Sequence, residues 1–496
     1  MRKSGWLVLP AAFFLLINFS ICGVKPLFLS RLIYFLFLVT LFFILRRFSL
    51  ERLLPPVVAG VSFILFLYGI IQKYVLFPYY LKNISPEDNF YSQAIITRIK
   101  TGRIFSLFPL PTLYAIVCAV FILFLLHYFI TTKNKNSKIW WALLLSAGLF
   151  NLILTQSFGG ILFLFLGVLI YLLLAKILEF KYLAPVLMVL SLFLFIIIAL
   201  RFSEAKEFEP VKLRFSNWKQ AARMIEAAPF WGVGLGNYEA KISYYTRASE
   251  AKSLYAHNFF LQFPAETGVI MPCILLLFLF FSRKNLKPRR PEEKTVYIAV
   301  LAVTLLYNLI DIGFYFFSAG IMAIIALSQI YPREQDNTLP AKKWVPVMHI
   351  AALAILSVFM IIEAISENHR RTADFSEAQK DYETALHYYK KSLQFNPYNY
   401  NAMVKFAQIT IASGNTAAAE PLLDKALDLY PDFALANYLK SNVEFKKKNL
   451  FRADYYAAAA YNKNKLDYHY RQWHQVLRQG LENLLKSLPL SRENAN

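Results

Sequence analysis

The residues best suited to chemistry lie at 212–268, between two long apolar segments of the chain. This stretch holds a basic helical pattern at 211–227, glycines at positions 232, 234 and 236, and one histidine, His257. An imidazole titrates at about pH 6.5 and can accept a proton from a hydroxyl group. A guanidinium offers a flat fork of donors that fits phosphate oxygens. The combination predicts chemistry on an anionic, lipid-linked substrate at a membrane surface.

His257 lies in the sequence AHN, where the chain is expected to re-enter the bilayer. The other histidines fall in the polar C-terminal region or toward the cytoplasmic side of the expected spans. Glu266 is expected to orient His257 or to cap a turn. Asp311 lies at the outer end of a later apolar segment. An acid inside an apolar span is costly, so Asp311, like Glu266, is a candidate functional residue. A structural, hydrogen-bonded histidine is the competing interpretation.

Arg214 opens the basic helix beside the expected membrane exit, and Leu213 and Trp218 lie on the apolar face of that helix. Pro229 and Gly232 end it. We expect Arg214 to hold phosphate, whereas the competing interpretation is a helix that only rests on the lipid surface. The glycine run follows no strand, so it predicts a tight turn with close backbone approach rather than a dinucleotide site.

A membrane domain is expected to position these residues. Hydrophobic residues make up 57% of the 496 positions and the mean hydropathy is +0.42, whereas soluble domains are about 45–50% apolar. Runs of about 20 apolar residues are long enough to cross the hydrocarbon. We predict eleven spans, near 6–23, 27–45, 54–72, 111–130, 139–156, 158–175, 182–200, 259–281, 295–312, 314–331 and 344–364.

The charge of the connecting loops predicts the orientation. With a cytoplasmic N-terminus, every short basic loop falls on the cytoplasmic side, where Lys and Arg are enriched. The loop 201–258 and the chain beyond about 365 then lie outside. Residues 1–23 also fit a signal peptide, whose removal would leave the rest of the topology unchanged.

The net charge of +22 does not indicate nucleic-acid binding, because much of the excess is loop charge and the sequence holds no recognisable nucleic-acid-binding module. Attraction to anionic membrane lipid is the expected consequence. Cys22, Cys118 and Cys273 fall in apolar spans and are interpreted as packing residues. The sequence has no Cys/His metal spacing, so we expect neither a metal nor another cofactor.

The C-terminal region is polar and repetitive. The phrase KKSLQFNP is matched in residue type by DKALDLYP, 34 residues later, and Ala385, Ala419 and Ala453 follow the same period. This pattern predicts tetratricopeptide repeats, with three helix pairs over 366–467 and a capping helix near 468–487. Such arrays form a concave groove for a peptide or a partner protein. An irregular helical tail is the alternative.

Five short blocks occur in order along roughly residues 100–330: an arginine before Trp218, M-I-x-x-x-P-x-x-G-x-G-x-G, AHN, E-x-G, and an L-I-D that ends at Asp311. This order resembles the O-antigen ligase and polymerase superfamily of bacterial membrane glycosyltransferases. Arg103, in RIFSLFPLPT, also resembles a block that precedes the fourth span of that family, although Pro109–Leu110 replaces the usual Pro-Asn.

The resemblance implies an inverting, metal-independent transfer of glycan from undecaprenyl diphosphate to an acceptor hydroxyl, outside the bacterial plasma (inner) membrane. It implies that His257 activates the acceptor hydroxyl and that Arg214 holds the diphosphate. The family often has Ser-Arg-Gly at the turn between the fifth and sixth spans, where this chain has Phe158. That phosphate-binding role is then vacant or taken by another arginine: Arg201, Arg103 or Arg223.

We therefore expect an all-α protein, with a transmembrane glycosyltransferase domain at 1–365, an external loop at about 201–258 and a repeat domain at 366–490. Glu266 and Asp311 complete the expected substrate site. The acceptor stays open between another lipid-linked glycan, a lipid A core and a protein hydroxyl. The alternative function is a non-catalytic scaffold that recruits periplasmic or extracellular proteins through the repeats. A transporter is disfavoured, because it predicts internal repeats of the spans.

Overall fold

The computed structural model describes residues 8–47, 50, 52–83, 96, 99–179, 181, 209–247, 250, 253–282, 291–330, 344–465 and 467–487. Throughout these residues the regular secondary structure is helical and no strand occurs. The expected all-α fold is therefore confirmed. The expected span at 182–200 and the candidate residue Arg201 lie outside the described residues.

The N-terminal part is a bundle of helices. They are α1 (Val8–Ile21), α2 (Lys25–Leu45), α3 (Leu54–Ile71), α4 (Phe77–Asn83), α6 (Pro111–Thr131), α7 (Lys135–Leu154), α8 (Phe158–Leu174), α10 (Glu209–Ala227), α11 (Tyr238–Lys241), α12 (Phe259–Thr267), α13 (Ile270–Ser282), α14 (Pro291–Tyr307) and α15 (Phe317–Ile330). A π-helical turn joins α3 to α4 at Gln72–Leu76. Short 3₁₀ turns, η4 and η6, follow at Ile242–Tyr244 and Gly313–Tyr315.

Helix α6 lies at the centre of this bundle. Every residue from Leu113 to Leu125 is buried, because α3, α7, α8, α14 and α15 all pack against α6. A helix that is apolar on all sides needs this kind of complete cover. Close packing with α8 depends on Gly160, where an added Cβ would lie 2.6 Å from the Cβ of Ala115.

Within the part of the chain that the structure describes, five helices are long and apolar enough to cross a membrane: Lys25–Leu45, Leu54–Asn83, Pro111–Thr131, Lys135–Leu154 and Val345–Ala378. A sixth span results if α12 and α13 are counted together, although they are bent by 113°. Shorter apolar helices occupy other expected spans, at Leu9–Ile21, Phe158–Leu174, Lys294–Tyr307 and Phe317–Ile330. Helices thus occupy every expected span within the described residues, while the count of eleven stays a prediction.

The C-terminal helices form the expected repeat array. They are α16 (Trp344–Ala378), α17 (Tyr382–Phe395), α18 (Tyr400–Ala412), α19 (Thr416–Leu429), α20 (Ala434–Lys446), α21 (Leu450–Lys463) and α22 (Tyr468–Ser487). Helix α16 pairs with α17, α18 with α19 and α20 with α21, and α22 covers the last pair. The expected domain boundary at 365–366 falls inside α16, so the repeats continue directly from the last membrane-capable helix.

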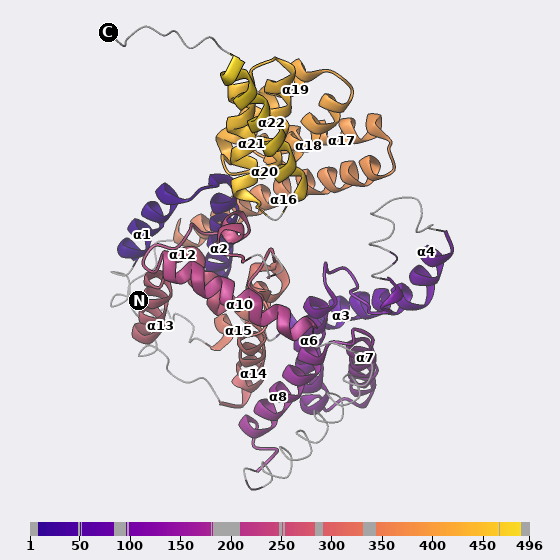
Figure 1. Ribbon diagram of the computed structural model, residues 1–496. Helices are drawn as coiled ribbons and strands as arrows, with labels where there is room; N and C mark the ends of the chain where they lie inside the picture. The colour runs from indigo at the N-terminus through magenta and orange to yellow at the C-terminus, as the bar shows by residue number, and fades with distance from the viewer. Residues whose placement is uncertain are drawn as a thin grey trace.

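The repeat domain is docked against the loop that carries the candidate chemistry. Asp432 accepts hydrogen bonds from Lys241 Nζ and from the Tyr244 hydroxyl, both at 2.8 Å. The Tyr430 hydroxyl donates to the Ala240 carbonyl at 2.9 Å. Figure 1 shows the repeat helices, in orange and yellow, gathered at one end of the molecule. Because the two parts touch, any membrane crossed by the bundle must leave both on the same side.

Candidate active site

The AHN sequence forms a rigid connection into α12. His257 has a left-handed backbone, with φ = +50°, which is uncommon for a residue with a side chain. Its carbonyl accepts a hydrogen bond from Trp218 Nε1 at 3.3 Å. Asn258 caps α12 by accepting from the Leu261 N–H at 3.2 Å. The Phe259 N–H donates to the carbonyl of Asp311 at 3.0 Å. These bonds hold His257 in a conformation that sequence propensity alone disfavours.

His257 is paired with Asp311. Its Nδ1 lies 3.3 Å from Asp311 Oδ1, and the imidazole is 31% exposed while the carboxylate is only 5% exposed. Asp311 also accepts from the Tyr307 hydroxyl and the Ile312 N–H, each at 2.9 Å. A carboxylate surrounded by donors is stabilised in its ionised form. It therefore favours the tautomer with the proton on Nδ1, which leaves the lone pair of Nε2 to accept a proton.

Arg214 lies on the first half of α10 and is half-buried. Its positive charge is close enough to act on the buried Tyr307 hydroxyl, the same hydroxyl that donates to Asp311. The structure thus brings an arginine and a histidine–aspartate pair to one end of α14, although the three residues are far apart in the sequence. Together they can place positive charge and a proton acceptor beside one reacting group.

The glycine run and the E-x-G block cross each other backbone to backbone. The Gly234 N–H donates to the Glu266 carbonyl at 2.9 Å. A Cβ on Gly232 would lie 2.4 Å from that carbonyl, and a Cβ on Gly268 would lie 2.0 Å from the carbonyl oxygen of Phe230. Both glycines have φ = +67°, so glycine is needed for conformation and for space. The expected tight turn with close approach is therefore present, and its partner is the bend between α12 and α13.

Glu266 belongs to this crossing. It is 1% exposed, and its carboxylate accepts from the Gly236 N–H at 2.7 Å and from the Tyr315 hydroxyl at 2.6 Å. A third donor is Gln262 Nε2 at 3.2 Å. Of the two roles expected for Glu266, the geometry corresponds to holding a turn, while Asp311 is the acid that contacts His257.

Arg223 contacts its own loop. Its Nε donates to the Tyr245 carbonyl at 2.9 Å, and its guanidinium forms an ion pair with Glu250. Glu250 also accepts from the Arg247 N–H at 3.0 Å. These contacts fasten α10 to the segment that leads to the histidine, and they occupy donors that a phosphate would need.

Arg103 belongs to the loop before α6, and its side chain reaches the turn between α7 and α8. Its Nε donates to the Thr155 carbonyl at 2.9 Å, next to the turn that contains Phe158. The π-helical turn holds this arginine's loop in place, because Gln72 Oε1 accepts from the Phe105 and Ser106 N–H groups at 2.8 and 2.9 Å. A π-helical turn inside an α-helix is often found at a functional site.

The turn at Phe158 is connected to the histidine site by packing. A Cβ on Gly159 would lie 2.9 Å from Ile310 Cδ1, and Ile310 precedes Asp311 in the chain. The Phe163 ring meets the Tyr307 ring edge to face, with centroids 6.3 Å apart. The start of α8 therefore packs against the chain segment that carries Tyr307 and Asp311.

Two residues of the site were missed in the sequence. Tyr307 is a tyrosine within an apolar run, and only its position four residues before Asp311, one helical turn away, could have indicated their contact. Arg31 lies near the start of α2, where the sequence alone indicates only a charged residue close to a loop. In the structure its guanidinium covers the Tyr315 ring at 4.8 Å and donates to the Tyr315 carbonyl at 3.0 Å.

The arrangement defines a multi-helical membrane-type protein that has a histidine–aspartate pair beside an arginine and a docked helical repeat domain. Residues 141–275 match the family model of the O-antigen ligase, and residues 377–443 match that of the tetratricopeptide repeat. Residues 141–275 are thus similar to the O-antigen ligase family and are followed by tetratricopeptide repeats, so the resemblance seen in the sequence is confirmed. Comparison with curated proteins and with solved structures finds no match.

The O-antigen ligase match supports a role in glycan transfer during polysaccharide biosynthesis, with a lipid-linked glycan as donor and a separate acceptor. The matched range contains Arg214, Arg223, His257 and Glu266 and ends before Asp311. The membrane-capable helices fit a multi-pass protein, and the repeats suggest contact with a protein.

Proposed function

We propose that the chain transfers a glycan from undecaprenyl diphosphate to an acceptor hydroxyl at the external face of the plasma membrane. The observation that carries this proposal is the His257–Asp311 pair, whose imidazole is partly exposed. A buried carboxylate that fixes the imidazole, and an imidazole that reaches accessible space, are the features a general base requires.

Each of the three side chains has one role in the proposed reaction. His257 Nε2 accepts the acceptor's hydroxyl proton while that oxygen attacks the anomeric carbon. The bond between the anomeric carbon and the diphosphate oxygen breaks, and the leaving diphosphate takes the electron pair. Asp311 stabilises the imidazolium that forms, and the Arg214 guanidinium stabilises the charge that develops on the diphosphate. No step needs a further reactant.

Arg103 is assigned to the phosphate-binding role that Phe158 leaves open. The arginine reaches the Thr155 carbonyl from a loop anchored by Gln72, which supports this assignment because Thr155 precedes Phe158 in the same turn. Arg223 is less suited to the role, because its donors are engaged by Glu250 and Tyr245.

The proposed topology is supported by two independent observations. The short basic loops favour a cytoplasmic side opposite the loop 201–258. The contacts between Asp432 and Lys241 require the repeat domain to lie on the same side as that loop, as the proposed topology demands.

The test is complementation in a strain that lacks the native protein, with surface polysaccharide as the measurement. We expect His257→Ala to reduce transfer by about 10²–10⁴-fold and Arg214→Ala by about 10²-fold. His387→Ala and Lys219→Ala are matched controls, because both side chains are exposed; each should restore wild-type glycan.

Membrane insertion of each variant is checked by detergent extraction and gel filtration. Wild-type polysaccharide from both correctly inserted site variants would reject catalysis and favour the scaffold. If single-unit chains accumulate instead, the activity is that of a polymerase. Full-length chains left on the lipid carrier identify a ligase.

A further inference from the structure

Two adjoining cavities lie between the repeat domain and the membrane domain. The smaller has a volume of about 210 Å³ and lies between α11, η4 and the repeats. The larger, of about 420 Å³, is bounded by α2, α16 and the first inter-repeat turn. Leu27, Tyr400 and Asn401 line both cavities, so they form one crevice, here called the interdomain crevice. Its size lies within the range of about 300–1,000 Å³ that is usual for ligand sites.

The repeats contribute to the crevice at a regular interval. Asn396, Tyr430 and Asn464 are 34 residues apart, and each caps the C-terminus of the second helix of its pair. All three line the crevice. Equivalent turns of successive repeats are thereby aligned along one wall, and a wall that repeats is suited to a ligand that repeats.

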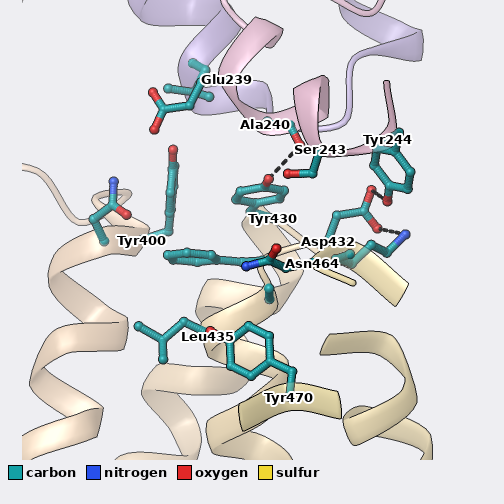
Figure 2. Close-up of a pocket in the computed structure, with 15 residues that line it drawn as sticks. Glu239, Ala240, Ser243, Tyr244, Tyr400, Tyr430, Asp432, Leu435, Asn464 and Tyr470 are labelled. Atoms are coloured by element: carbon teal, nitrogen blue, oxygen red, sulfur yellow. Dashed lines mark hydrogen bonds and ion pairs between the residues drawn. The ribbon is translucent and has the colours of Figure 1, made fainter. Parts of the chain in front are cut away.

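The lining combines aromatic faces with hydrogen-bonding groups. Figure 2 shows Tyr430 with its hydroxyl directed to Ala240 on the loop, and Glu239 facing Tyr400 across the smaller cavity. Tyr398, in the larger cavity, is 60% exposed. Tyrosine offers an apolar ring face together with a polar hydroxyl. Such a surface can stack on the C–H face of a sugar ring while amides and carboxylates bind its hydroxyl groups.

The charges of the crevice nearly balance. Glu239, Glu363, Glu367 and Asp432 line it together with Arg31 and Lys463. Lys241 and Lys463 pair with Asp432, and Arg370 and Arg371 pair with Glu367. A crevice without a strong net charge suits a neutral ligand, such as a neutral sugar chain.

The crevice reaches toward His257 through Tyr255. The Tyr255 ring meets the His257 ring edge to face, with centroids 6.5 Å apart. The Tyr255 ring also meets the Phe316 ring, with centroids 6.4 Å apart, and the two neighbours of Phe316 in the chain, Tyr315 and Phe317, line the larger cavity. His257 is therefore two ring contacts away from the wall of the crevice, so a chain bound there can direct its end toward the imidazole.

We propose that the interdomain crevice binds a neutral oligosaccharide, and so holds the sugar chain whose end reacts at His257. The proposal rests on the proposed function for the identity of the reacting end, but the binding itself does not require catalysis. It assigns the repeat domain a direct part in holding substrate.

The test measures binding to the purified full chain in detergent by isothermal titration calorimetry. The probe is the oligosaccharide that mild acid releases from the lipid carrier of the cells that make this protein. Oligogalacturonate serves as an acidic comparator and a pool of unstructured peptides as a protein comparator. We expect Tyr398→Ala to raise the Kd about three- to tenfold, as loss of an aromatic contact does. Tyr455→Ala is the matched control, because that side chain is 69% exposed on the same domain but outside the crevice.

His257→Ala separates this proposal from the proposed function. It should bind the released oligosaccharide as the wild type does, whether or not it still transfers glycan. Equal affinities of the wild type and Tyr398→Ala for the oligosaccharide would overturn the crevice proposal. So would tighter binding of oligogalacturonate, or displacement of the oligosaccharide by the peptide pool.

Discussion

Asp311 and Glu266 are two buried carboxylates of this region. They differ in whether one of their hydrogen-bond partners is exposed to the substrate. Every donor to Glu266 belongs to the framework: the Gly236 amide, the Tyr315 hydroxyl and Gln262. Asp311 also has framework donors, but one partner is an imidazole that is 31% exposed. A buried acid can act on chemistry only if one of its partners reaches the substrate. Glu266 therefore maintains the shape of the site, whereas Asp311 controls its reactivity.

Two arginines of α10 show the same division. Arg214 and Arg223 are nine residues apart, about two and a half helical turns, so they project from opposite sides of the helix. Arg223 joins α10 to Glu250 and Tyr245 within the loop. Arg214 lies on the side of Tyr307. Two arginines of the same helix thus have different roles, because their side chains point to opposite sides of it.

The strongest test of this comparison is Asp311→Asn. The amide keeps an acceptor for Tyr307 but no longer favours the proton on Nδ1 of His257, so Nε2 loses its basicity. We expect the rate of transfer to fall by about 10²–10⁴-fold, the range of general base catalysis. The measurement is turnover of lipid-linked glycan by the purified protein in detergent.

The control for Asp311→Asn is its thermal unfolding. The variant should unfold within several degrees of the wild type, because the amide has nearly the shape of the carboxylate and keeps the acceptor of Tyr307, so that only the Ile312 N–H loses an acceptor oxygen. Wild-type turnover by a folded Asp311→Asn protein would remove Asp311 from the mechanism and leave it, like Glu266, as part of the framework.

Glu266→Ala should have its effect on stability. The change leaves the Gly236 amide and the Tyr315 hydroxyl buried without their acceptor, and each such loss costs about 1–3 kcal/mol. We expect the free energy of unfolding to fall by about 2–5 kcal/mol, measured as a lower thermal midpoint in detergent. Glu266→Gln is the matched variant, because it retains one acceptor oxygen for both donors. It should keep most of the stability and nearly wild-type turnover per folded molecule. Turnover as low as that of Asp311→Asn would contradict the comparison.

The features that could be predicted from the sequence are those set by neighbours along the chain. Spacing in glycines 232, 234 and 236 indicated a close approach, and the 34-residue period indicated the repeats. The basic helix around Arg214 was clear from its hydrophobic pattern. Each of these signals arises from local geometry, which a short window of sequence records.

The pairing of His257 with Asp311 could not be predicted, because it joins residues 54 positions apart. The choice between Glu266 and Asp311 depends on the bend at Gly268, which turns α12 away from α13 and directs Glu266 toward Gly236. Arg103 reaches its turn only because a π-helical turn at Gln72 redirects the loop. Such arrangements are decided by tertiary packing, which composition and periodicity do not record.

The smallest expected effect concerns the backbone of His257 rather than its side chain. In Trp218→Phe the indole N–H that donates to the His257 carbonyl is lost, while the aromatic ring remains. One hydrogen bond contributes about 0.5–1.5 kcal/mol, so turnover should fall about two- to tenfold as the strained backbone relaxes. Trp140→Phe is the control, since Trp140 is 67% exposed and lies on α7; it should leave turnover unchanged. If Trp218→Phe instead lowered turnover as much as Asp311→Asn, the position of the imidazole would depend on its backbone as much as on its carboxylate partner. The AHN turn would then belong with the reactive groups rather than with the framework.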